Sequence, residues 1–78
     1  MDRLCSLIAG ILAVKPSDVR PETGPGNLAK WDSFAHIQLM SALEEIYRLK
    51  FTTEEMVDVS SVAEIADLLK RKGADLRA

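Results

Sequence analysis

A segment rich in proline and glycine interrupts the sequence after residue 14. It reads KPSDVRPETGPGNLAKW, residues 15–31, and contains all three prolines of the chain. Because proline lacks an N–H donor and glycine favours turns, neither a helix nor a central strand continues through it. Its apolar residues Val19, Leu28 and Trp31 predict a loop that is pinned across a core. Any fold of this chain must therefore accommodate one long, partly buried connection.

Both sides of this loop have the periodicity of amphipathic helices. From Asp2 to Val14 the apolar residues recur at intervals of three and four, and we expect Pro16 to end this helix. A second helix is predicted from Asp32 or Ser33 to about Arg48. Its predicted core face comprises Leu39, Leu43, Ile46 and Tyr47, and its second apolar edge comprises Phe34, Ile37 and Ser41.

Two capping motifs predict the remaining helices. Thr52 followed by Glu55 is a capping-box pattern and opens a short third helix to about Asp58. Ser61 and Glu64 repeat the pattern and open a fourth helix that ends before Gly73. The apolar stripe of this helix consists of Val62, Ile65, Ala66 and Leu69. The sequence predicts an all-α fold, a small four-helix bundle with a long loop between helices one and two and a short third helix.

The length of 78 residues fits one domain, residues 1–78, in which residues 73–78 are expected to fray. A domain of this size buries only about 60% of the surface of its unfolded chain, which leaves little room for a deep catalytic cleft. We therefore do not expect an enzyme. The net charge of -2 argues against nucleic acid as the main partner, because phosphate binding requires clustered basic residues.

The lone cysteine and the absence of long apolar runs indicate a cytoplasmic protein. Cys5 excludes an internal disulfide and fits a reducing compartment, and we expect it to be half-buried packing. No apolar run approaches the roughly 20 residues that span a bilayer, so no membrane partner is expected. One histidine and one cysteine far apart in sequence predict no metal site.

Ser33 has two interpretations. It is either the N-cap of the second helix or, if Asp32 takes that role, a free hydroxyl in the first turn. In the second case a phosphate on the hydroxyl would be favoured by the positive end of the helix dipole. A Ser-His-Asp hydrolase is disfavoured because Asp32 is badly placed to orient His36, which we expect on the helix surface.

Several stretches together resemble the acyl carrier proteins and their peptidyl and aminoacyl relatives. They are VKPSDV before the long loop, DSF where the family has Asp-Ser-Leu, ALEEIY in the second helix, and FTTEEMVDVSSVAEIADLL. The resemblance covers nearly the whole chain. It implies that Ser33, preceded by Asp32 as helix cap and motif residue, carries 4'-phosphopantetheine, which a phosphopantetheinyl transferase takes from coenzyme A.

The resemblance also implies a set of partners. The thiol of the cofactor would receive an acyl or aminoacyl group from a loading ligase and deliver it to an acyltransferase or synthase. A carrier that visits several enzymes is expected to be a monomer. The partner-facing edge implied by the resemblance consists of Phe34, Ile37, Gln38, Ser41, Glu44, Glu45, Met56 and Val57.

The chain departs from the family pattern around the serine. Lys30 stands where many members have glycine, Trp31 adds a bulky ring beside the attachment site, and Phe34 replaces leucine. The stretch from Ala35 to Ser41 contains no acid, which favours a dedicated partner set and a specialised pathway.

Two alternatives stay open at the level of sequence. An unmodified helical interaction module would use the same exposed edge of the second helix. Cargo burial is the other open point, because one set of apolar residues could either line an internal space or fill the core: Leu39, Leu43, Met56, Val59 and Ile65.

Overall fold

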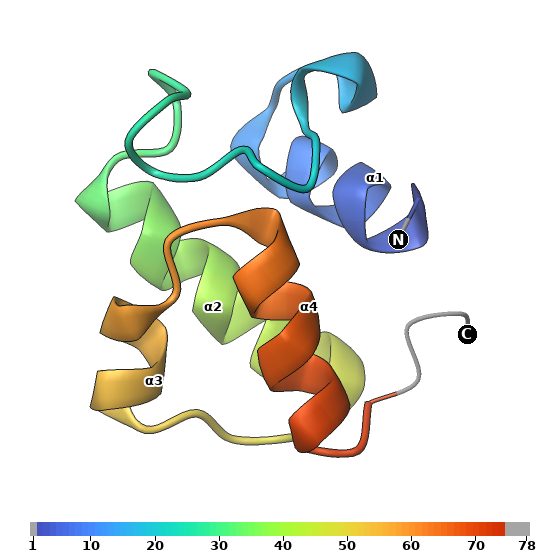
Figure 1. Cartoon of the computed structure of the whole chain (residues 1–78), viewed down its shortest axis with the longest axis vertical. Coiled ribbons are helices and arrows are strands. Elements are labelled where there is room, and N and C mark those ends of the chain that lie inside the picture. The colour runs from blue at the N-terminus through green and yellow to red at the C-terminus, as the bar shows by residue number, and fades with distance from the viewer. Residues whose placement is uncertain (1, 75–78) are drawn as a thin grey trace.

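The computed structural model describes residues 2–74 and is built from α-helices. They are α1 (Asp2–Leu12), α2 (Ser33–Tyr47), α3 (Thr53–Asp58) and α4 (Val62–Arg71), with a 3-10 turn, η1, at Pro16–Asp18 (Figure 1). No strand occurs within residues 2–74, which confirms the predicted all-α bundle with a long α1–α2 loop. In this part of the chain no helix is long and apolar enough to cross a membrane.

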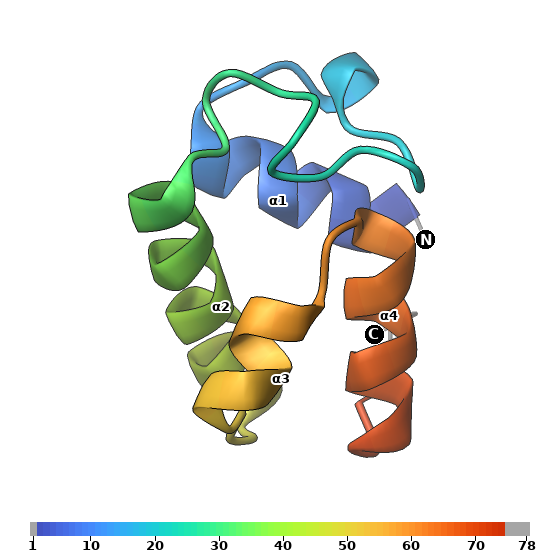
Figure 2. The same cartoon turned by 60° about the vertical axis from the view of Figure 1, so that its left-hand side comes forward.

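The helices surround one core. Figure 2 shows α2 and α4 on opposite sides, the short α3 in front of them, and α1 crossing the end of the bundle where α4 begins. The predicted stripe of α4 is fully buried, and α1 contributes Leu4, Ile8 and Leu12. Cys5 is half-buried, as expected. Residues 75–78, part of the tail expected to fray, lie outside the described residues.

The first helix ends earlier than predicted. Pro16 was expected to end it, but α1 stops at Leu12 because Ala13 adopts a left-handed conformation with φ of 59°. The Val14 N–H then donates to the Ala9 carbonyl at 3.0 Å, which closes the last turn. Pro16 instead begins η1, where its fixed φ suits the first position of a helical turn.

The core face of α2 differs from the predicted one at one position. Leu39 and Leu43 are buried as predicted, but Ile46 is 47% exposed and its assignment to the core is wrong. Residues one apart are rotated by about 100° around a helix, and here the half-buried Tyr47 occupies the last inward position. Met40, which the sequence did not single out, is fully buried.

The capping motifs of α3 and α4 are formed to different extents. The Thr52 hydroxyl accepts the Glu55 N–H at 3.1 Å and the Glu55 carboxylate accepts the Thr52 N–H at 2.8 Å, a complete capping box. In α4 the Ser61 hydroxyl accepts the Glu64 N–H at 3.2 Å, but the Glu64 carboxylate turns to the N–H and hydroxyl of Ser60. The second box is therefore only half formed.

An ion pair holds α3 against the end of α4. Glu55 lies 2.8 Å from the ammonium of Lys72, directly after α4, and both residues are half-buried. The hydrogen bond from Lys72, followed by that from the Thr52 backbone, lowers the pKa of Glu55 below its usual value. Because the folded-state pKa is lowered, this contribution to stability is present above the ordinary carboxyl pKa and is lost as the pH falls through the folded value.

The long loop is pinned as predicted, and it caps α4. Val19 and Trp31 are buried, and Leu28 is half-buried. The carbonyl of Thr23 accepts the Val62 N–H at 2.8 Å, and the carbonyl of Pro21 accepts the Ala63 N–H at 2.9 Å. These are among the donors that a helix start leaves without an intrahelical partner, so the loop and α4 stabilise each other.

The loop approaches the α3–α4 link closely at Gly24. A Cβ at this position would lie 1.9 Å from the Ser60 carbonyl oxygen, whereas one at Gly26 would meet nothing within 4 Å. We expect Gly24→Ala to lower the free energy of unfolding by about 1–3 kcal/mol, because backbone atoms must shift. Gly26→Ala should stay within about 0.5 kcal/mol of the parent protein. Urea unfolding of both variants checks this, and equal effects would contradict the close approach.

Candidate functional site

Ser33 is the first residue of α2, and its side chain is exposed. The cap is Asp32, whose Oδ1 accepts the Ala35 N–H at 2.8 Å from an extended backbone conformation. This decides between the two interpretations of the sequence, since Ser33 is not needed to cap the helix. Its hydroxyl makes no hydrogen bond to any residue in the described part of the chain.

An open cleft lies beside Ser33. It has a volume of about 350 Å³ and is bounded by the α1–α2 loop, α2, α3 and the α3–α4 link. Its lining residues are Pro25, Gly26, Ser33, His36, Ile37, Val57, Val59 and Ser60. Its walls are mostly apolar and include no acidic side chain, so it suits an uncharged organic group attached to the serine.

His36 does not lie on the helix surface, and this expectation was wrong. The residue is 8% exposed. Trp31 donates its indole N–H to Nδ1 of His36 at 2.9 Å, and Nε2 of His36 lies 2.6 Å from the Met56 carbonyl oxygen. A neutral ring with its proton on Nε2 satisfies both contacts. The imidazole therefore joins the loop before Ser33 to α3, and it is buried because its partners replace water.

The position of Trp31 follows from the same contact. Trp31, expected beside the attachment site, is fully buried, and its ring centre lies 6.0 Å from that of His36 with an angle of 29° between the ring planes. An indole N–H can be buried without cost only if it finds an acceptor. The sequence carried no clear signal for the pair, because an indole donor five residues before an imidazole is not at a helical spacing.

The arrangement excludes His36 as a general base for Ser33. One ring nitrogen accepts from Trp31 and the other faces Met56, so neither is directed at the serine hydroxyl. Within residues 2–74 no group of three His, Cys, Asp or Glu side chains is arranged to hold a metal.

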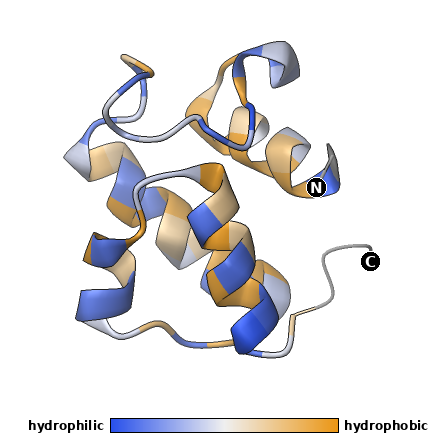
Figure 3. Cartoon of the chain, viewed as in Figure 1, coloured by the Kyte–Doolittle hydropathy of each residue, from blue (hydrophilic) through white to orange (hydrophobic). Residues whose placement is uncertain are grey.

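The edge expected to face partners is exposed and apolar at its centre. Phe34 is 72%, Ile37 48% and Val57 67% exposed. The remaining predicted members are distributed around them: Gln38, Ser41 and Glu45 are exposed, and Met56 and Glu44 are half-buried. We call Phe34, Ile37 and Val57 the apolar face. Much of the ribbon of α3 is hydrophilic (Figure 3).

Glu44 has a structural role that the sequence did not show. Its Oε2 accepts the Phe51 N–H at 2.7 Å, which fixes the link between α2 and α3. Phe51 is thereby held in the core at 8% exposure. The signal was too weak to recognise, because a donor seven residues away in a loop has no fixed spacing.

The comparison with known proteins adds the decisive observation. The family model described as phosphopantetheine attachment site matches residues 2–69. The chain belongs to this family. It is also 27% identical over 74 residues to a protein named acyl carrier protein from Thermosynechococcus vestitus. The aligned region covers 95% of this chain and 91% of that protein. Members of the family are carriers that hold 4'-phosphopantetheine and are not themselves catalysts.

The residues around Ser33 fit such a group. The hydroxyl is exposed and free of capping, and it lies at the positive end of α2, where a phosphodiester is electrostatically favoured. The apolar cleft next to it offers a surface for the organic arm beyond the phosphate. The charge of Asp32 opposes the phosphate slightly, but its carboxylate is engaged with the Ala35 N–H.

Proposed function

We propose that the chain is a carrier that is modified on Ser33 and shuttles an acyl or aminoacyl thioester between partner enzymes. The observation that carries the proposal is the free, exposed Ser33 hydroxyl at the start of α2, within the region that the family model matches. When bound, the cofactor supplies a thiol on a flexible arm. A cytoplasmic monomer suits this role, and the single cysteine fits a reducing compartment.

The modification needs another enzyme to activate the serine. The Ser33 oxygen attacks the phosphorus of coenzyme A that bears pantetheine, and a phosphodiester bond forms as the pyrophosphate linkage breaks. Adenosine bisphosphate leaves, and the serine proton passes to a base of the phosphopantetheinyl transferase, assisted by Mg²⁺. The chain itself contributes an exposed serine hydroxyl at the start of a helix.

Intact mass spectrometry tests the proposal. Purified protein is incubated with coenzyme A, Mg²⁺ and a transferase of broad specificity, and its mass should rise by one phosphopantetheine group. A protein that stays unmodified, although a known carrier in the same tube is modified, would reject the proposal. The apolar face would then favour the alternative of an unmodified helical interaction module.

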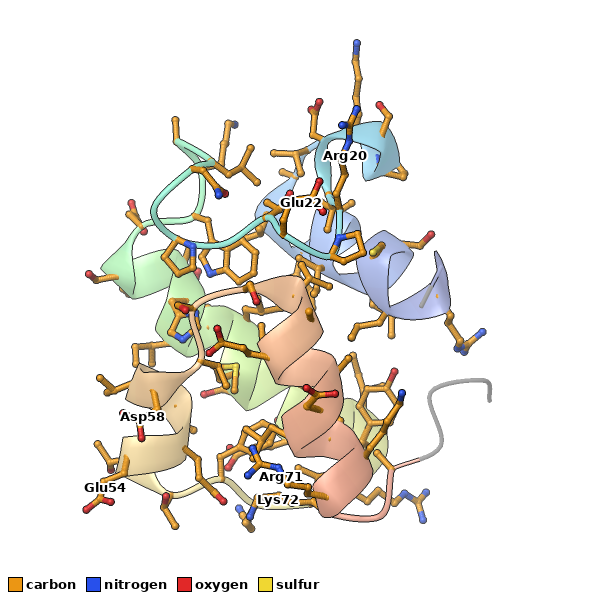
Figure 4. The ribbon with its side chains drawn as sticks, viewed as in Figure 1. Arg20, Glu22, Glu54, Asp58, Arg71 and Lys72 are labelled. Carbon is orange, nitrogen blue, oxygen red and sulfur yellow. The ribbon has the colours of Figure 1, made fainter. Side chains whose placement is uncertain are left out.

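The charges around the apolar face support a dedicated set of partners. Glu54 and Asp58 point outward from α3 (Figure 4), whereas α2 carries no acid between Ala35 and Ser41. A matching partner therefore has an apolar recess with basic groups toward α3 and toward the end of α2, where Glu45 is exposed. This pattern supports the proposal of a specialised pathway, with a loading ligase and an acyltransferase or synthase that recognise it.

Replacing Phe34 by serine should slow transfer without destabilising the fold, because the ring is 72% exposed. Central aromatic residues of interfaces often contribute 2 kcal/mol or more, so kcat/KM of the transferase should fall roughly tenfold or more. Ile46→Ser is the matched control, since Ile46 is an exposed apolar residue on the same helix but outside the apolar face. An equal loss in both variants would contradict recognition through Phe34.

A further inference from the structure

The contacts of His36 form a clamp about one helical turn after Ser33. The indole of Trp31, the imidazole of His36 and the carbonyl of Met56 make a continuous chain of polar contacts of 2.9 and 2.6 Å. It joins the end of the long loop, the first turn of α2 and the short helix α3. Trp31 is fully buried and His36 is 8% exposed, so the clamp lies inside the protein.

Two paths lead away from Ser33 for anything attached to it. One runs outward along the open cleft past Ile37 and Val57, which are both exposed. An inward route to the core would have to pass between α2 and α3, which the contact from His36 to Met56 joins. The clamp crosses the start of the inward path, because His36 follows Ser33 by one helical turn and its ring reaches across to α3.

Opening the inward path would be unfavourable. Separating α3 from α2 leaves the Met56 carbonyl and the His36 N–H without partners, and turning His36 away does the same to the Trp31 indole. Buried polar groups that lose their partners oppose such a change. The residues beyond the clamp, Leu39, Leu43 and Ile65, are each 0% exposed and pack against one another in the core cluster.

We infer that Trp31 and His36 determine the class of cargo by closing the core to it, so that this chain carries a short or polar acyl group outside the bundle. A long alkyl chain held outside would expose apolar surface to water, which is unfavourable in proportion to its length. A short or polar group exposes little apolar surface, so its exposure to water outside the bundle costs little free energy. The inference rests on the proposed modification of Ser33.

Loading two acyl groups of different length tests this. A transferase of broad specificity attaches acetyl- and octanoyl-phosphopantetheine directly from the corresponding coenzyme A thioesters, without the native ligase. Intact mass confirms loading first, so failure of the modification itself is recognised before cargo placement is measured. The two loaded proteins are then compared by thermal unfolding and by NMR contacts between the octanoyl chain and the methyl groups of Leu39, Leu43 and Ile65.

The wild-type protein should have the same Tm with either group and no contacts from the octanoyl chain to the core. His36→Ala removes the clamp and creates space, so its octanoyl form should gain core contacts and have a Tm several degrees above its acetyl form. His36→Gln retains a donor and an acceptor and should behave as the wild type. Ile46→Ala, at an exposed position of the same helix outside the partner-facing edge, is the control.

Core contacts from octanoyl in the wild-type protein would overturn the inference, and this measurement does not depend on whether any variant folds. If the folded His36→Ala protein also excludes the octanoyl chain, the clamp is not what closes the core. That result would overturn the role assigned to His36 as well.

Discussion

Ser33→Ala is expected to abolish the mass increase that follows incubation with coenzyme A and a phosphopantetheinyl transferase. The reason is chemical, since the alanine methyl group has no oxygen to attack phosphorus. The fold should be retained, because Asp32 caps α2 and the Ser33 hydroxyl bonds to no residue within 2–74. Free energies of unfolding of the two apo proteins should agree within about 0.5 kcal/mol, the usual range for exposed sites.

Ser6→Ala is the matched control for this variant. Ser6 is also an exposed serine, but it lies on α1, outside the cleft and outside the predicted partner-facing edge. It should be modified to the same extent as the wild-type protein. If the Ser33→Ala protein still gains the mass of the cofactor, the assignment of the attachment site is wrong.

Trp31→Ala should have the largest effect on stability. The indole is fully buried and is the largest side chain in the core, and truncation of such residues typically costs about 3–5 kcal/mol. The loss also leaves Nδ1 of His36 without its donor, which adds to the penalty. Such a loss is a large share of the free energy of unfolding of a typical domain, which is about 5–15 kcal/mol.

Trp31→Phe separates packing from hydrogen bonding. Phenylalanine retains most of the apolar contact but cannot donate to His36, so we expect a loss of about 1–3 kcal/mol from the unsatisfied acceptor together with a small cavity. Urea unfolding followed by circular dichroism measures both variants. If Trp31→Ala lowers the free energy of unfolding by less than about 1 kcal/mol, the ring does not stabilise the core as its burial indicates.

Much of the fold could be predicted because it depends on local chemistry. The Thr52 and Glu55 capping box closes within one turn, and the stripe of α4 repeats at helical spacing, so both are readable from neighbouring residues. The end of α1 was predicted too late in the sequence. Ala13 adopts a left-handed conformation, which alanine rarely does, so its residue type gave no indication of the helix end.

The site was predictable in part for the same reason. From the sequence, either Asp32 or Ser33 could cap α2. The structure shows that the helix begins at Ser33 and that Asp32 is its N-cap. His36 was misassigned because its partners are a side chain outside its helix and a carbonyl twenty residues away. Such contacts depend on tertiary packing, and no spacing rule predicts them. The same applies to the bond from Phe51 to Glu44.

The proposed carrier function depends most directly on which atom carries the cofactor. Trypsin cleaves after Lys30 and Arg48, which releases a peptide whose only serines are Ser33 and Ser41. Tandem mass spectrometry of this peptide, after the wild-type protein has reacted with coenzyme A and a transferase, should locate phosphopantetheine on Ser33 alone. An unmodified peptide, or a modification on Ser41, would contradict the account.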